Sequence, residues 1–250
     1  MGYDYLIMSR QEWISPEGYR LDGRRAEEVR RLNANIGVLP GVDGSAFLEL
    51  GNTKILATVH GPSEPKLRSN IYFDRVFINC EYSVATFSTT ERRRQSKGDR
   101  QTSDISSVMK QAFEAAIITS LYPRSQIDIF VHVLQSDGGD IAACLNAGTL
   151  ALIDAGLALR DCMVAVTAGY IDGTPLLDLN YMERVAHTPE LVVAVLPRTK
   201  KVILCQMEGK SHVDAFESIL KLAVRGAVAI SSELREEIIS RTRERAFIRN

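Results

Sequence analysis

The chain has 250 residues, 45% of them apolar, which is enough for one large domain or two small, closely packed ones. Thirty basic residues against thirty-one acidic ones give a net charge of −1, which excludes a bulk field that attracts RNA, DNA or anionic lipid. Any contact with nucleic acid therefore requires a local basic patch.

The first predicted elements are strands. Short apolar runs between residues 35 and 59 are separated by turn-forming residues at 41–44 and 51–52, which predicts a β-meander. A further strand is predicted at 76–87, after a loop that contains proline and charged residues.

An amphipathic helix is predicted next, because apolar residues recur at three- and four-residue spacing from Ile105 to Ile117. We expect Thr102 or Ser103 to cap its start and Tyr122-Pro123 to end it. A strand at 127–134 follows, and an apolar helix begins after Gly138-Gly139. The first half thus has the order ββββαβα.

The second half is predicted to start after Arg160-Asp161, with strands at 163–171, 174–179, 191–196 and 202–207. A last helix is expected from about Val213, with one apolar stripe. Both halves run from strands to helices, which predicts an α+β fold of two similar subdomains, mixed β-sheets flanked by helices, at 15–157 and 160–245.

Between the predicted strand at 127–134 and the apolar helix after it stands Gly138-Gly139, followed by Asp140 and Ile141. Glycines at the start of a helix let an anion approach exposed backbone amides, which carry partial positive charge. Asp140 stands where that anion would sit and repels it. The turn therefore looks like a phosphate cradle closed by its own sequence.

The segment 178–184 follows a predicted buried strand. Asp178 is a candidate general acid or metal ligand, although a lone carboxylate in this position is more often a turn or capping residue. Arg184 lies beside Glu183 and weakens the case for a metal site formed by two carboxylates. We expect no metal and no cofactor.

The segment 91–100 carries five positive charges, at Arg92, Arg93, Arg94, Lys97 and Arg100. Such a loop can neutralise several phosphates of RNA, and it can equally be a solvated connector.

The four cysteines, Cys80, Cys144, Cys162 and Cys205, lie far apart in apolar surroundings, and we expect four buried thiols in a reducing compartment. No apolar run approaches the roughly 20 residues of a membrane span, and residues 1–13 do not resemble a signal peptide. A nuclear or cytosolic protein without a membrane partner is expected.

Five separated motifs in the right order resemble the RNase PH family over about residues 15–239. They are EGYRLDGRRAEEVR, DGSAFLELGNTKILATVHGP, NCEYSVATFST, PRSQIDIFVHVLQSDGG and GTPLLDLNY. The resemblance implies an RNase PH-like fold. Active members are phosphorolytic exoribonucleases, in which inorganic phosphate attacks the terminal phosphodiester bond of RNA and releases a nucleoside diphosphate.

The resemblance also implies where an active member holds its phosphate: a Ser or Thr and then an Arg follow the Gly-Gly turn. Asp140 and Ile141 occupy those places here. Active members carry two aspartates six residues apart after the strand; the first matches Asp178, and Arg184 stands at the second. Three of four expected groups are thus replaced, which implies no catalytic residues and a pseudo-enzyme.

On the RNA side, active relatives place two basic residues just before the first amphipathic helix. Arg100 matches one of them, and Gln101 stands at the second. Arg124 matches a basic position near the pore-facing site. Arg92, Arg93 and Arg94 are our own suggestion for compensating contacts, since the resemblance does not supply them.

The implied function is a non-catalytic ring subunit of the RNA exosome that guides single-stranded RNA through a central channel. Its expected partners are a second RNase PH-like subunit, the other ring subunits, RNA-binding cap subunits and an associated hydrolytic exoribonuclease. The expected locations are nucleus, nucleolus and cytoplasm. Two alternatives stay open: an active phosphate-dependent exoribonuclease, and a nucleotide-processing enzyme on the same scaffold that binds a small molecule near Gly138-Gly139.

Overall fold

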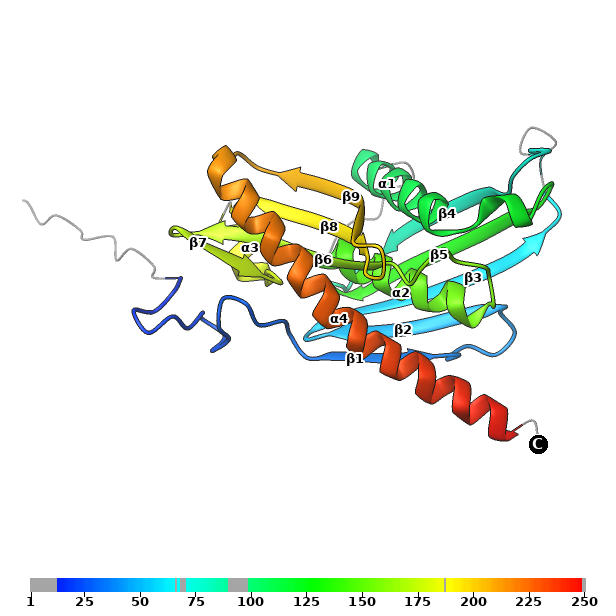
Figure 1. Ribbon diagram of the computed structural model, residues 1–250, viewed down its shortest axis with the longest axis horizontal. Helices are drawn as coiled ribbons and strands as arrows, with labels where there is room; N and C mark the ends of the chain where they lie inside the picture. Colours follow the sequence, from blue (N-terminus) through cyan, green and yellow to red (C-terminus); the bar gives the residue numbers. More distant parts are fainter. Residues whose placement is uncertain (1–12, 66, 68–70, 90–98, 187, 249–250) are drawn as a thin grey trace, which may run out of the picture.

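Two β-sheets form the framework of the protein. The computed structural model describes residues 13–65, 67, 71–89, 99–186 and 188–248. The two sheets lie side by side, with helices packed over and between them (Figure 1).

The first sheet has five strands in the order β1-β2-β3-β5-β4. All neighbours are antiparallel except β4 and β5, which are parallel, so the chain must cross over between them. The strands are β1 (Leu32–Ile36), β2 (Gly44–Leu50), β3 (Thr53–Ser63), β4 (Phe77–Val84) and β5 (Gln126–Gln135).

The second sheet has four strands in the order β7-β6-β8-β9, and all of its pairs are antiparallel. The strands are β6 (Val164–Ile171), β7 (Thr174–Leu177), β8 (Glu190–Leu196) and β9 (Lys201–Glu208). The short helix α3 (Tyr181–Val185) joins β7 to β8.

The helix α2 (Asp140–Asp154) lies between the two sheets and packs against β2 and β3 on one side and β6 on the other. Every residue from Ile141 to Leu152 is buried, as expected for a helix that is apolar all round. Its buried amide, Asn146, donates to the carbonyl of Ala165 at 2.9 Å and accepts from the Ala165 amide at 2.7 Å. These bonds hold α2 against β6.

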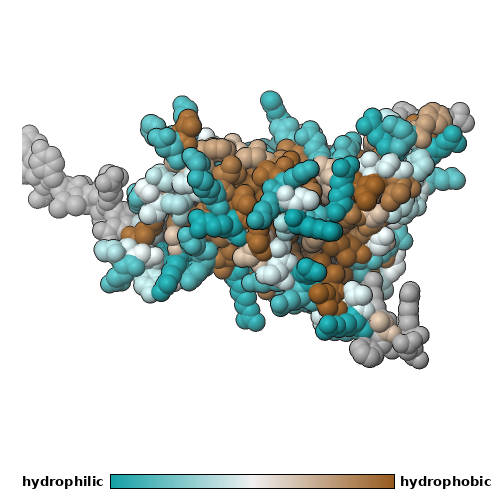
Figure 2. Space-filling view, in the orientation of Figure 1, coloured by the Kyte–Doolittle hydropathy of each residue, from teal (hydrophilic) through white to brown (hydrophobic). Residues whose placement is uncertain are grey.

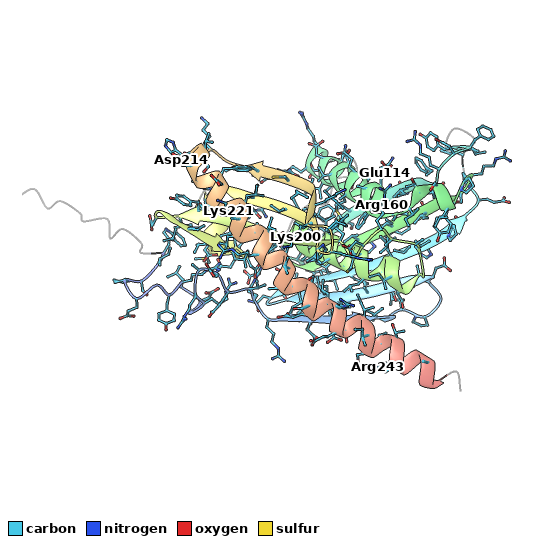
Figure 3. The ribbon with its side chains drawn as sticks, viewed as in Figure 1. Glu114, Arg160, Lys200, Asp214, Lys221 and Arg243 are labelled. Carbon is cyan, nitrogen blue, oxygen red and sulfur yellow. The ribbon has the colours of Figure 1, made fainter. Side chains whose placement is uncertain are left out.

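Two further helices cover the sheets from outside. Helix α1 (Arg100–Ala116) makes the crossover between β4 and β5 and packs against β4, and the 3-10 turn Thr119–Leu121 follows it. Helix α4 (Val213–Ile248) crosses the second sheet and reaches β1 (Figure 1). Lys221 and Arg243 lie along α4 (Figure 3), and apolar patches appear between polar side chains on this face of the molecule (Figure 2).

The structure confirms the α+β fold class, the order ββββαβα of the first half and the long last helix. Three details differ from the prediction. Helix α1 begins two residues before Thr102, whose hydroxyl donates back to the carbonyl of Asp99 at 2.7 Å, so Thr102 lies in the first turn and does not cap it. The helix also ends at Ala116, before Tyr122-Pro123, and α3 was not predicted.

The expectation of four buried thiols was also wrong. Only Cys144 is buried; Cys80 and Cys162 are half-buried, and Cys205 is exposed, although all four are free. The reason for Cys205 is topological: it lies on β9, an edge strand with one uncovered face.

Candidate functional site

The Gly138-Gly139 turn and the segment after β7 are in contact, although they lie forty residues apart in the chain. Both glycines have positive φ, 85° and 68°, and Gly139 is the N-cap residue of α2. A Cβ on Gly138 would lie 2.6 Å from the carbonyl oxygen of Leu179, so only glycine permits this approach. The structure thus brings together the two motifs that the sequence singled out.

Asp140 opens α2, as expected, and its side chain lines a pocket at this end of the helix. The Ser136 hydroxyl donates to this carboxylate at 2.6 Å, and the guanidinium of Arg184 lies 3.8 Å from it. The next residue, Ile141, is almost fully buried at 8% exposure. A negative side chain and an aliphatic one therefore stand where a phosphate would need positive charge and hydrogen-bond donors.

Arg184 lies on α3 among carboxylates. Besides Asp140, it contacts Glu190 at 3.1 Å and Glu208 at 4.0 Å. Burial raises the pKa of Glu190, Arg184 opposes the rise, and the nearby charges of Glu208 and Asp140 add to it. The positive charge of Arg184, at a position where the resemblance implies an acid, is thus shared by three acids.

A pocket of about 290 Å³ opens at this cluster, between the start of α1, the start of α2, α3 and β9. Among the residues that the structure describes, its charged lining residues are Asp104, Asp140, Arg184 and Glu208, three acids and one base. A pocket with this balance repels anions.

Asp178 does not line that pocket, because its carboxylate is turned into the protein and held by arginines. Arg30 forms a two-pronged ion pair with it, Nε to Oδ2 at 2.8 Å and Nη2 to Oδ1 at 2.7 Å, and also donates its backbone amide at 2.8 Å. Arg24 donates to Oδ2 at 3.2 Å. Asp178 is 1% exposed. Of the roles considered for Asp178, the geometry fits the turn residue, fixed by ion pairs.

The ion pair with Asp178 also determines the state of Arg30. Although burial opposes the charged form, the hydrogen bond and the charge of Asp178 raise the pKa of Arg30 above its usual value. Arg30 also donates to the carbonyls of Asp137 at 2.8 Å and Gly138 at 3.0 Å. One guanidinium therefore connects the Gly-Gly turn to the end of β7.

A second buried ion pair fixes α3. Arg20, 3% exposed, donates from Nε to the carboxylate of Glu183 at 2.7 Å and from Nη1 to the carbonyl of Leu177 at 2.6 Å. Glu183 also completes a capping box with Asn180 at the start of α3. Sequence reasoning missed this helix, although the pattern N-x-x-E at 180–183 was a usable signal. It also missed Arg20, Arg24 and Arg30, because nothing local shows where their side chains lead.

The predicted RNA-binding residues separate into three groups. Arg100 is the first residue of α1, with its side chain 95% exposed and 3.9 Å from Asp104, which lines the pocket. Arg124 follows the other end of this helix, which is about 25 Å long, and its guanidinium covers the ring of Phe73 at 4.9 Å. The remaining residues, Arg92, Arg93, Arg94 and Lys97, fall outside the described residues.

The described residues hold neither a cluster of metal-binding side chains nor a membrane-spanning helix. They contain no group of three or more His, Cys, Asp or Glu side chains that could hold a metal ion. No helix among them is long and apolar enough to cross a membrane.

Comparison with known proteins is consistent with this geometry. Residues 28–158 match the model of the 3′ exoribonuclease family, domain 1, and residues 161–226 match domain 2 of the same family. The chain is 46% identical over 242 residues to exosome complex component RRP41 of Homo sapiens, covering 96% of this chain and 99% of that protein. It is 48% identical over 239 residues to the RRP41 homolog of Arabidopsis thaliana, covering 95% and 99%.

Two solved structures share the fold. Rrp46 of rice (Oryza sativa) superposes with a TM-score of 0.77 at 21% identity, over 88% of this chain and 100% of that one. A chain of the Archaeoglobus fulgidus exosome with RNA bound to the active site superposes with a TM-score of 0.75 at 21% identity, over 87% and 93%.

Proposed function

The chain belongs to the 3′ exoribonuclease family of RNase PH proteins, and from this premise we propose that it is a catalytically silent ring subunit of the RNA exosome. Relatives at 46–48% identity, matched over almost their whole length, are named as exosome complex components. The ring role of this chain is supported by those names and by the shared fold.

The observation that carries the proposed silence is the charge at the start of α2. An attacking phosphate must be held by donors and cations, and here it meets Asp140 and Ile141, while Arg184 is engaged by Asp140 and two glutamates. Losing a preorganised anion partner costs about 3–4 kcal/mol of transition-state stabilisation, or more than a hundredfold in rate. The one expected acid that remains, Asp178, is held by Arg30 away from the pocket.

In this role the protein helps to line a channel for single-stranded RNA. Contacts with phosphates are independent of sequence and allow sliding, which suits a conduit. Arg100 and Arg124 are the proposed RNA contacts among the described residues, and Arg92, Arg93, Arg94 and Lys97 are proposed on sequence alone. RNA guided this way would reach an associated hydrolytic exoribonuclease for processing and turnover.

The proposed partners are a second RNase PH-like chain, bound edge to edge, the other ring subunits and RNA-binding cap subunits. The two sheets end in the strands β1, β4, β7 and β9, which offer edges for such pairing. We place the protein in the nucleus, nucleolus and cytoplasm, and the subdomains at 15–157 and 160–245.

Co-purification tests the ring role. The full chain carrying an affinity tag is isolated from cells, and the bound proteins are identified by mass spectrometry. Several RNase PH-like chains in stoichiometric amounts are expected. Recovery of the chain alone, or with proteins unrelated to this family, contradicts the proposal.

The RNA contacts are tested in the assembled complex by titration of a labelled single-stranded RNA at several salt concentrations. Arg100→Ala should weaken binding for all sequences and lower the slope of log affinity against log salt by about one. Lys221→Ala, an exposed lysine on α4, is the matched control and should leave the slope unchanged. Equal slopes for Arg100→Ala and wild type contradict the assignment of Arg100.

A further inference from the structure

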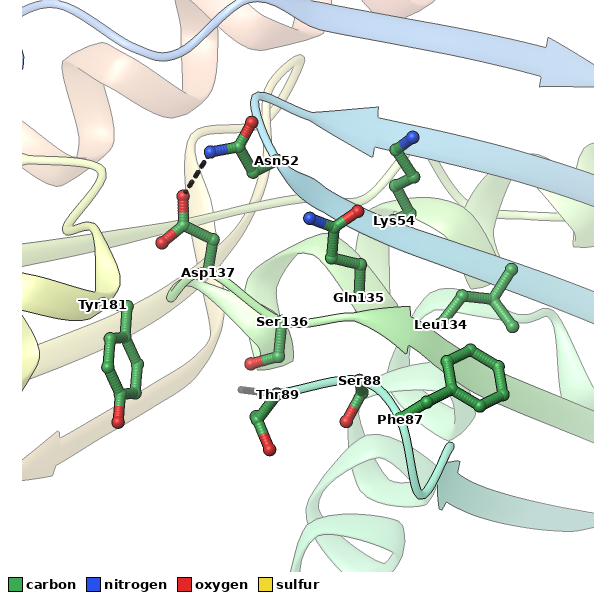
Figure 4. Close-up of a pocket in the computed structure, with 10 residues that line it drawn as sticks. All are labelled: Asn52, Lys54, Phe87, Ser88, Thr89, Leu134, Gln135, Ser136, Asp137 and Tyr181. Atoms are coloured by element: carbon green, nitrogen blue, oxygen red, sulfur yellow. Dashed lines mark hydrogen bonds between the residues drawn. The ribbon is translucent and has the colours of Figure 1, made fainter. Parts of the chain in front are cut away.

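A second pocket, of about 590 Å³, adjoins the closed one and shares three lining residues with it, Thr89, Ser136 and Tyr181. Four segments form it: the start of β3, the end of β5, the residues that follow β4, and α3 (Figure 4). None of the roles assigned above uses this space.

Ser88 lines this pocket with a buried hydroxyl that lacks a hydrogen-bond partner in the part of the chain that the structure describes. The residue is only 4% exposed. Its backbone is fixed, because its carbonyl accepts from the Ser136 amide at 3.0 Å and its amide donates to Ala85 at 3.0 Å. An unsatisfied buried hydroxyl costs free energy, so a group that enters the pocket and bonds to it recovers that cost.

The neighbouring residue, Phe87, is exposed, whereas Ser88 is buried. Its ring lines the pocket but is 74% exposed, and the ring of Tyr181 in the same lining is 43% exposed. Such an aromatic surface beside a pocket suits a flat ligand group, because each of the nucleobases can stack on an aromatic ring.

The pocket has a basic residue at one end and an acidic residue at the other. Lys54 lies at the same end as Phe87, and Asp137 lies at the end near Tyr181 (Figure 4). Lys54 Nζ lies 3.7 Å from Glu49 Oε1, which is a loose ion pair, so the positive charge of Lys54 is available to a phosphate. Asp137 is oriented by the side-chain amide of Asn52 at 3.0 Å, and a carboxylate accepts well from the hydroxyls of a ribose.

We propose that this pocket, the Phe87–Ser88 pocket, binds one ribonucleotide residue. The base stacks on Phe87, the Ser88 hydroxyl hydrogen-bonds to the bound residue, the phosphate lies near Lys54, and the ribose hydroxyls donate to Asp137. An acid within the pocket excludes a second phosphate there but favours ribose over deoxyribose, because the 2′-hydroxyl is the group that distinguishes RNA from DNA. The inference rests on the proposed function only in taking single-stranded RNA as the source of that residue.

The first test measures binding of fluorescein-labelled twelve-nucleotide oligoadenylate, as RNA and as DNA, by fluorescence anisotropy. Phe87→Ala should weaken RNA binding about tenfold. The aromatic control Tyr19→Ala, at an exposed ring outside the pocket, should bind as wild type does. Unchanged RNA affinity of Phe87→Ala contradicts RNA as the source of the bound residue.

Two further variants separate a binding role from a structural one. Ser88→Ala removes an unsatisfied hydroxyl, so the free protein should unfold at the same temperature or higher while RNA affinity falls. Asp137→Asn should reduce the preference for RNA over DNA. A Ser88→Ala protein that loses thermal stability and keeps its RNA affinity contradicts the pocket, as does an unchanged preference in Asp137→Asn.

Adenosine 5′-monophosphate distinguishes the two sources of a ribonucleotide. If it binds wild type but not Phe87→Ala, and RNA affinity is insensitive to Phe87, the pocket takes a free nucleotide; if neither ligand depends on Phe87, the site does not exist. All titrations are repeated in the assembled complex, where loss of binding would show that a partner side chain fills the pocket and overturn the proposal. Co-purification is measured separately, so failure of the ring role and failure of the pocket give different results.

Discussion

The guanidinium of Arg184 lies 3.8 Å from the carboxylate of Asp140 and joins α3 to the start of α2. The resemblance to active relatives implies the reverse arrangement, an acid at 184 and a base next to position 140. In this chain the acid stands at position 140 and the base at position 184, so the two side chains attract each other. Either change alone would have placed two like charges together. Under the proposed function, the ion pair that stabilises this region is also what closes it to phosphate.

Arg184→Gln should lower the free energy of unfolding by about 1 kcal/mol at neutral pH, because it leaves three carboxylates without their shared cation. The loss should depend on pH. The pKa of Glu190 is raised above 4.5 in the folded state, so the folded protein binds this proton more tightly, and stability falls as pH rises from 4.5 through the folded pKa. Removing Arg184 raises the pKa of Glu190 further and widens the pH range over which stability falls.

Urea unfolding of wild type and Arg184→Gln between pH 5 and pH 8 measures this effect. Glu190→Gln should flatten the pH dependence of both proteins, and Arg160→Gln, at an exposed arginine, serves as the control. Parallel stability curves for wild type and Arg184→Gln would show that the cluster is not coupled as described.

The sequence predicted the strands and the helices α1, α2 and α4 because each depends on local patterns. Alternating or continuous apolar runs marked the strands, and the glycine pair marked the start of α2. The partner of Asp178 could not be predicted in this way, since Arg30 lies 148 residues earlier and only the fold brings the two together. The Phe87–Ser88 pocket was missed for the same reason: its walls come from four separate segments.

Asp178→Asn should destabilise the protein by about 3 kcal/mol, because Arg30 would keep its buried charge without the carboxylate that offsets it. Asparagine tolerates the positive φ of 55° at this position, so backbone strain does not confound the comparison. Chemical denaturation gives the difference. Asp22→Asn, at a partly exposed carboxylate paired with Arg24, is the control and should cost less than about 1 kcal/mol. A similar loss in both variants would argue against a structural role for Asp178.

Gly138→Ala should separate the Gly-Gly turn from the segment after β7. The added Cβ would lie 2.6 Å from the carbonyl of Leu179, whereas one at Gly173, with nearly the same φ, meets no heavy atom within 4 Å. Gly173→Ala should therefore cost only the strain of positive φ, about 1 kcal/mol, and Gly138→Ala about 2 kcal/mol more. Thermal unfolding compares them. Equal melting temperatures would mean that the close contact is not maintained in solution.

Restoring the expected groups should return some phosphorolysis. In the triple variant Asp140→Thr, Ile141→Arg, Arg184→Asp, the pocket regains a hydroxyl, a guanidinium and an acid, and loses the carboxylate that repels phosphate. Activity is measured as nucleoside diphosphate released from RNA with a single-stranded tail, in the assembled complex and in the presence of inorganic phosphate. A variant that assembles with its ring partners but stays inactive would show that these three positions do not by themselves explain the silence.

The most direct test is the same assay on the unaltered protein. The purified chain, alone and with its ring partner, is incubated with tailed RNA and inorganic phosphate, and the products are separated by chromatography. With Asp140 and Ile141 in the cradle, no nucleoside diphosphate should form and the RNA should keep its length. Phosphate-dependent shortening of the RNA with release of nucleoside diphosphates, lost when Asp178 is replaced by asparagine in a still-folded protein, would contradict the account.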